Sequence, residues 1–86
     1  MELQQLKENL ATPSAQSRKL YHQHPTLYRD VVIVEDYFRQ VAANQAAKIP
    51  APMTRARLEI LSAYGIGQHT FYEILGLVRS LCTSSV

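Results

Sequence analysis

Residues 26–47 read TLYRDVVIVEDYFRQVAANQAA, and this stretch contains the clearest periodic pattern in the sequence. Its apolar side chains recur at steps of four, three, four and three residues, which places them along one side of an α-helix. These side chains are Leu27, Val31, Val34, Phe38 and Val41. We therefore predict one continuous helix over Thr26–Ala47, with this stripe buried.

A β-strand is the competing interpretation for the middle of this segment. Val31 to Val34 are four successive β-branched residues, which favour a strand locally. The apolar stripe continues beyond this run in both directions, and a long pattern at helical spacing outweighs a short run. The sequence therefore favours the helix.

Two shorter helices are predicted before this segment. Leucines at helical spacing indicate a first helix over Glu2–Ala11. Thr12 followed by Pro13 is typical of an N-cap and the first helical residue, so a second helix is expected over Pro13–His22. Pro25 then ends it, because the residue before a proline avoids the helical region.

A proline-containing linker, residues 48–53, separates these helices from a C-terminal pair. We expect Thr54 to cap the next helix, with Met53 and Leu58 forming a hydrophobic staple. That helix should end at Gly65, which suits a left-handed residue after a helix. The last helix follows Gly67 and ends in a frayed tail at 83–86. Its expected core face is Phe71, Ile74, Leu75, Val78, Leu81 and Cys82.

Size and composition define the class of protein. The 86 residues allow a single domain, 1–86, and a hydrophobic content of 47% is too high for a disordered chain. The predicted fold is all-α: a bundle of four or five helices with a long central helix and a C-terminal helix-turn-helix-like pair. A domain of this size buries little surface, so we also expect self-association, as a dimer, or a protein partner.

Charge and cysteine content constrain the partners and the compartment. Nine Lys or Arg against seven Asp or Glu give a net charge of +2, a bias too weak to establish or exclude DNA binding. The one cysteine cannot form an intrachain disulfide, which agrees with a reducing compartment. The first residues lack the apolar segment of a signal peptide, and no apolar run is long enough to span a membrane. We expect a cytoplasmic protein that does not associate with a membrane.

Residues 58–75, LEILSAYGIGQHTFYEIL, have the pattern of two helices joined by a tight glycine turn. A helix-turn-helix needs a small residue at the turn and apolar residues around it that fix the angle between the helices. The second helix can then place polar side chains in the major groove of DNA. Residues with the required spacing are Ile60, Tyr64, Ile66, Phe71 and Ile74.

The string GIGQHTFY, residues 65–72, resembles the G-I-G-x-x-T-L-Y stretch of helix-turn-helix DNA-binding domains in Fis-like bacterial regulators. The resemblance extends from Leu58 to Leu81. It implies that Arg55 and Arg57 lie near phosphates. It also implies a groove-facing side formed by Gln68, His69, Tyr72 and Glu73.

The sequence departs from this family at two positions. Leu61 stands where a small residue is usual, and Glu73 follows the tyrosine where basic residues are usual. An acidic side chain facing DNA lowers affinity unless it accepts from a cytosine amino group.

Two other interpretations of the same residues remain open. The segment is also similar to a helix-hairpin-helix, in which hairpin amides bind phosphate, although that family prefers alanine where Phe71 stands. Alternatively, the turn only joins two helices of a bundle. Thr70 and Glu73 could then form a capping box that starts the last helix at Phe71 and lengthens the turn.

The histidines do not form a recognisable metal or catalytic site. His22 and His24 lack the further ligands that a metal site requires, and His69 has no nucleophile beside it, so no metal, cofactor or catalytic site is predicted. Aromatic and apolar residues on the third segment would suit an interface, with packing in the protein's own core as the equal alternative. These residues are Tyr28, Tyr37, Phe38 and Val41.

The sequence thus predicts a small, non-enzymatic regulatory protein that binds duplex DNA. The alternative is a protein–protein adaptor or chaperone-like subunit whose apolar helix faces dock a partner. The two differ in the environment of Gln68, His69 and Tyr72. Exposure beside Arg55 and Arg57 favours DNA binding, whereas burial in a bundle favours the adaptor.

Overall fold

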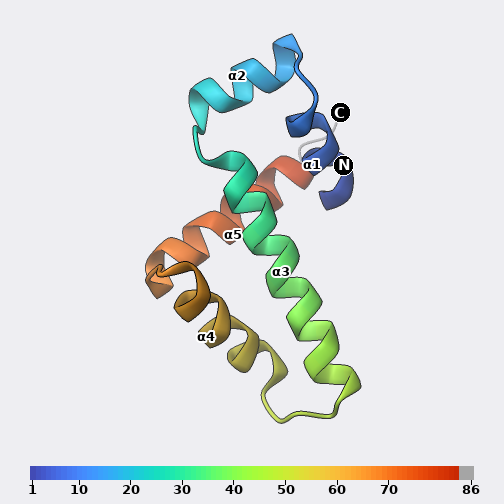
Figure 1. The fold of residues 1–86 in the computed structure, drawn as a ribbon, viewed down its shortest axis with the longest axis vertical. Coiled ribbons are helices and arrows are strands. Elements are labelled where there is room, and N and C mark those ends of the chain that lie inside the picture. The colour runs from blue at the N-terminus through green and yellow to red at the C-terminus, as the bar shows by residue number, and fades with distance from the viewer. Residues whose placement is uncertain (84–86) are drawn as a thin grey trace.

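The computed structural model describes residues 1–83, which form five helices and no strand (Figure 1). The helices are α1 (Leu3–Ala11), α2 (Ala15–Gln23), α3 (Leu27–Ala46), α4 (Pro52–Tyr64) and α5 (Gln68–Thr83). The prediction of an all-α bundle with a long central helix is confirmed. Of the predicted tail, Thr83 is the last residue of α5, and 84–86 lie outside the described residues.

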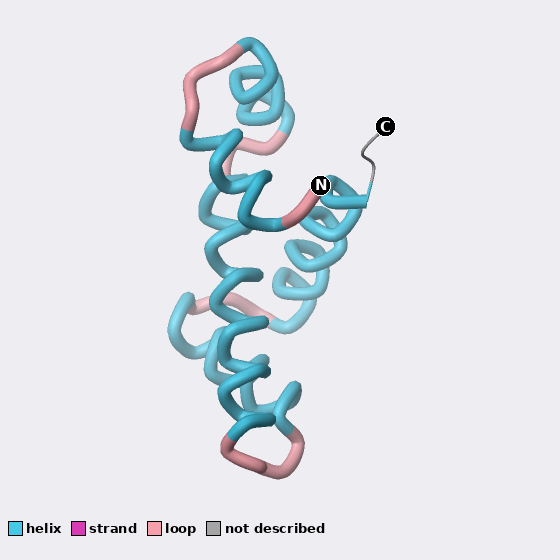
Figure 2. Tube along the Cα trace, turned by 90° about the vertical axis from the view of Figure 1, so that its right-hand side faces the viewer, coloured by secondary structure: helices cyan, strands magenta, loops and turns pink. Residues whose placement is uncertain are grey.

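The five helices form an elongated molecule of 43 × 24 × 19 Å. In Figure 1, α3 runs along the long axis, α4 returns beside it, and α5 crosses toward α1. The view in Figure 2 shows the same order, with α2 at one end of the molecule. Helix α3 packs against α1, α4 and α5, so it is the centre of the fold.

Helix α3 is continuous, as predicted, and the strand interpretation is wrong. Leu27, Val31 and Val34 of the predicted stripe are buried. Phe38, in contrast, is 52% exposed, and Val41 is only partly buried, so this end of the buried stripe was predicted wrongly.

The reason is that α3 uses a second face. Ile33 and Tyr37, outside the predicted stripe, are buried. Further along, the Asn44 side-chain amide donates to the Pro52 carbonyl oxygen of α4 at 3.1 Å. Since α4 packs on this second face, the far end of the stripe is left without a covering helix.

The N-terminal helices are tied to α3 and to each other. Leu6 and Leu10 of α1 are buried, and Lys7 Nζ donates to Glu35 Oε1 of α3 at 2.9 Å. Helix α2 is attached to α1 by the Tyr21 hydroxyl, which donates to the Leu10 carbonyl oxygen at 3.0 Å. These contacts place α1 over the first half of α3.

The predicted start of α2 is wrong. Ser14, not Thr12, is the N-cap: its hydroxyl accepts from the Ser17 backbone N–H at 3.0 Å, and Ser17 Oγ accepts from the Ser14 N–H. This reciprocal capping box satisfies two donors that a helix leaves free at its start. With Thr12 as the N-cap, the third helical residue would be Ala15, whose side chain has no acceptor for the reciprocal hydrogen bond.

The predicted start of α4 is also wrong. The helix begins at Pro52, whose fixed φ suits the first helical position, so Thr54 is already inside the first turn and caps nothing. Met53 and Leu58 are 59% and 54% exposed and do not form the predicted staple. The linker is therefore shorter than expected, and it holds two non-glycine residues at positive φ: Lys48 at 57° and Ala51 at 51°.

Candidate nucleic-acid interface

The turn between α4 and α5 is as tight as a helix-turn-helix requires. Gly65 has φ +63°, the left-handed conformation that was predicted for it. Its N–H and that of Ile66 both donate to the Leu61 carbonyl oxygen, the latter at 3.2 Å, which closes α4 with a Schellman-type turn. No atom lies within 4 Å of a Cβ built on Gly65, so backbone conformation rather than lack of space selects glycine here.

Helix α5 begins directly after this turn, at Gln68. The Phe71 N–H donates to the Gly67 carbonyl oxygen at 3.0 Å, so the helical hydrogen bonds start before Phe71. The longer turn with a capping box between Thr70 and Glu73 is therefore not formed. Glu73 instead pairs with His69 one helical turn earlier.

Apolar residues around the turn fix α4 and α5 to the core. Ile60, Phe71 and Ile74 are buried, and Tyr64 and Ile66 are partly buried against the same cluster. The Phe71 ring meets that of Tyr37 edge-on, with centroids 5.1 Å apart. These five positions occupy the places that the pattern assigned to them.

A polar contact also fixes the turn to α3. The Tyr64 hydroxyl, at the last residue of α4, donates to Asp36 Oδ2 at 3.0 Å. Burial alone would raise the pKa of Asp36. The hydrogen bonds from Gln40, Arg39 and Tyr64 outweigh that effect and hold the pKa below its ordinary value. Burial, and then the hydrogen bond to Asp36, raise the pKa of Tyr64. The sequence did not predict a role for Asp36, because Tyr64 lies 28 positions away and no local pattern joins them.

The polar side chains that the motif assigned to DNA lie on the outside of α5. Gln68 and His69 are exposed, and Tyr72 is 47% exposed. His69 Nε2 pairs with Glu73 Oε1 on this surface, so the acidic residue lies among the candidate DNA contacts.

The two arginines of α4 have different environments. Arg57 Nη1 donates to the Tyr72 hydroxyl at 2.6 Å, and its guanidinium carbon lies 6.0 Å from the centre of that ring. The Nε of Arg57 is buried and has no hydrogen-bond partner among residues 1–83. Arg55 is exposed and forms no ion pair within the described residues. Arg55 is thus free to contact a phosphate, whereas Arg57 joins α4 to the outer side of α5.

The candidate interface residues of α3 do not form one surface. Tyr28 and Phe38 are 37% and 52% exposed, Val41 is partly buried, and Tyr37 is packed in the protein's own core. Arg79, which sequence reasoning did not select, is a further exposed cation on α5.

Comparisons with known proteins give no relative. No family model, no curated protein and no solved structure matches this chain. In the part of the chain that the structure describes, no three His, Cys, Asp or Glu side chains are grouped so that they could hold a metal ion. None of the helices described is both long and apolar enough to cross a membrane.

Proposed function

We propose that this protein binds duplex DNA through the outer side of α5, as a small regulatory protein of the helix-turn-helix class. The observation that carries the proposal is the contrast at the start of α5. Gln68 and His69 are exposed, while the turn before them is fixed by Gly65 and by the buried Phe71. A rigid helix start with exposed polar side chains is the arrangement that reads base edges in the major groove.

The arrangement of three helices supports the same proposal. Helices α3 and α4 lie beside one another and α5 crosses α3, so α5 is held from one side and open on the other (Figure 1). In this arrangement Gln68 and His69 read bases, and Arg55 contacts the backbone. Arg57 positions Tyr72 through their hydrogen bond. The expected self-association stays a prediction, which the mass of a protein–DNA complex would check.

The charge distribution predicts weak binding that depends on salt. Each phosphate contact contributes a slope of about −0.9 to the log–log dependence of affinity on salt. Arg55 together with one to three further phosphate contacts gives a slope of about −2 to −4. Glu73 on the same surface opposes a phosphate backbone, so we expect non-specific affinity at the weak end of the range for such domains.

The test is fluorescence anisotropy of a labelled duplex, started at ~50 mM salt, where electrostatic contacts are strong. Arg55→Ala should weaken binding to all sequences and make the salt dependence shallower by about one unit. Arg18→Ala is the matched control, because Arg18 is also exposed but lies on α2. If the wild-type protein does not bind at low salt, or if both variants weaken it equally, the DNA proposal is wrong. The adaptor function then becomes the leading candidate.

A further inference from the structure

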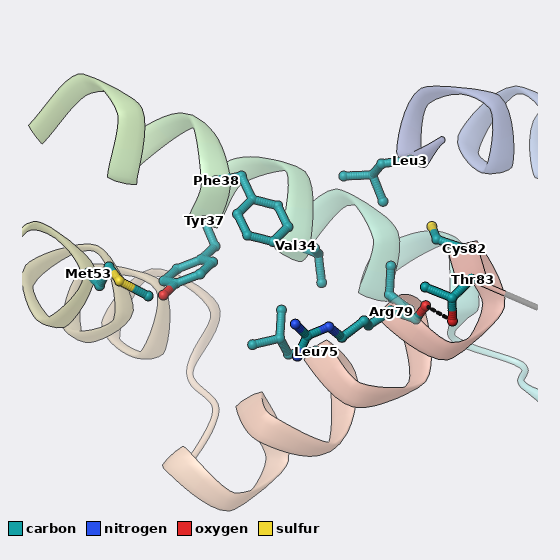
Figure 3. Close-up of a pocket in the computed structure, with 10 residues that line it drawn as sticks. Leu3, Val34, Tyr37, Phe38, Met53, Leu75, Arg79, Cys82 and Thr83 are labelled. Atoms are coloured by element: carbon teal, nitrogen blue, oxygen red, sulfur yellow. Dashed lines mark hydrogen bonds between the residues drawn. The ribbon is translucent and has the colours of Figure 1, made fainter. Parts of the chain in front are cut away.

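An apolar groove lies on the side of the molecule where α1, α3, α5 and the start of α4 meet (Figure 3). Its volume is about 380 Å³, within the range of small-molecule sites in proteins. Val34 and Phe38 of α3 form one wall and Leu75 of α5 the other, with Leu3 of α1 at one end. Val78 of α5 also lines the groove. Phe38 lies at the part of the α3 stripe that no helix covers, which explains why the groove exists.

One charged side chain belongs to this lining. Arg79 extends from α5 along the groove, in the direction of Leu75 one turn earlier (Figure 3). It is exposed and makes no ion pair within residues 1–83, and none of the ten residues that line the groove is acidic. The groove therefore combines an apolar interior with one unpaired cation at its edge.

The size of this apolar surface argues against a protein as its occupant. A standard interface buries roughly 800 Å² on each partner. Of the five large apolar side chains that are exposed, only Phe38 and Met53 line the groove, whereas Tyr28, Leu58 and Tyr72 do not. A second copy or a partner helix would need a wider apolar surface than this one.

We infer that the groove is a binding site for a small apolar molecule that ends in a carboxylate, of the kind that a medium-chain fatty acid represents. The chain would lie between Val34, Phe38 and Leu75, and the carboxylate would pair with the Arg79 guanidinium, a charge-assisted contact. The site lies on the inner flank of α5, away from Gln68 and His69. The inference is therefore independent of DNA binding.

Octanoate and 1-octanol are the probes that test this inference, because they share a chain length but differ in charge. Both should cause saturable, one-to-one shifts in the amide NMR signals of Val34, Leu75 and Val78, with Ile60 of the far core unaffected. Arg79→Gln should weaken octanoate binding on the order of tenfold, the value of one charge-assisted hydrogen bond, and change octanol binding less than twofold. Arg55→Gln is the matched control and should change neither.

Three results would overturn the inference. The first is the absence of saturable shifts at concentrations where octanoate is monomeric. The second is an equal effect of Arg79→Gln on octanoate and on octanol, which would leave no role for the charge. The third is a dimer by light scattering whose groove signals change on dilution without ligand, because a second copy would then occupy the groove.

Discussion

The inner and outer sides of α5 differ in burial and in polarity. On the inner side Phe71, Ile74 and Val78 are at most 5% exposed and pack in the core. On the outer side Gln68, His69 and Glu73 are exposed, and His69 pairs with Glu73. The inner side therefore determines where α5 lies, and the outer side is available for recognition. Substitutions on the inner side should therefore change mainly stability, and substitutions on the outer side should change mainly binding.

The largest expected effect comes from two adjacent residues on opposite sides. Phe71→Ala removes a fully buried ring that contacts Tyr37, and should lower the free energy of unfolding by about 3–5 kcal/mol. Tyr72→Ala, one position later, removes a half-exposed ring and its contact with Arg57, and should cost about 1 kcal/mol or less. Urea denaturation measures both. Similar losses for the two variants would show that α5 has no distinct outer side.

The second effect concerns the turn that orients both sides. Gly65→Ala places a side chain at φ +63° and should destabilise the protein by about 1–2 kcal/mol. Lys48 is the matched control: it follows α3 at φ 57°, and the Ile49 N–H donates to Asn44 O at 2.9 Å in the same kind of turn. Lys48→Gly should therefore be neutral or stabilising. Thermal unfolding measures the stability of both variants relative to wild type. A Gly65→Ala protein as stable as wild type would contradict the left-handed conformation of Gly65.

How much of the fold could be predicted from the sequence depends on how far apart in the sequence the interacting residues lie. The α3 helix and the Gly65 turn follow from local patterns, so both were predicted. The exposure of Phe38 was not, because the stripe shows which side of α3 is apolar but not how far α1 and α5 extend along it. The α2 start at Ser14 was missed because Thr12-Pro13 and Ser14 are competing local signals.

In the candidate site, too, local features were predicted and contacts between helices were not. The family resemblance implied that Gln68 and His69 lie outside, and the apolar spacing predicted that Phe71 and Ile74 lie inside. Both are local properties, because they depend on position along one helix. Arg57 was expected near phosphates, and its contact with Tyr72 across the turn was not predicted, because it depends on the angle between α4 and α5. Asp36 was missed because its contact with Tyr64 depends on how α4 packs against α3, 28 positions away in the sequence.

A third, smaller effect tests the contact that holds the turn against α3. Tyr64→Phe removes the hydrogen bond to Asp36 and should cost about 1 kcal/mol near neutral pH. The pKa of Asp36 is lowered in the folded state, so the stability that this carboxylate contributes is present above its unfolded pKa of about 3.9 and is lost as pH falls through the folded pKa. The stability difference between wild type and Tyr64→Phe should therefore shrink below about pH 4. A difference that stays constant from pH 7 to acid would show that the carboxylate is not the partner that matters.

The smallest expected effect on stability is that of Glu73→Gln on the outer side. Glu73 is exposed, and its one ion pair within the described residues is with His69, so the unfolding midpoint should stay within the error of the measurement. Removal of its charge should strengthen non-specific DNA binding severalfold, because the side chain then no longer repels phosphate. Anisotropy at low salt measures this, with Glu8→Gln on α1 as the exposed control. Equal effects of the two substitutions would mean that only net charge matters.

The most direct test of the account is an amide NMR titration of the protein with duplex DNA at ~50 mM salt. The account predicts that the largest shifts fall on residues 65–73, at the turn and the first turns of α5. Signals of the inner positions Ile74 and Val78 should move less, and those of α2 should stay unchanged. Absence of shifts, or shifts centred on α2 or on the groove around Phe38, would contradict the claim that the outer side of α5 is a DNA-binding surface.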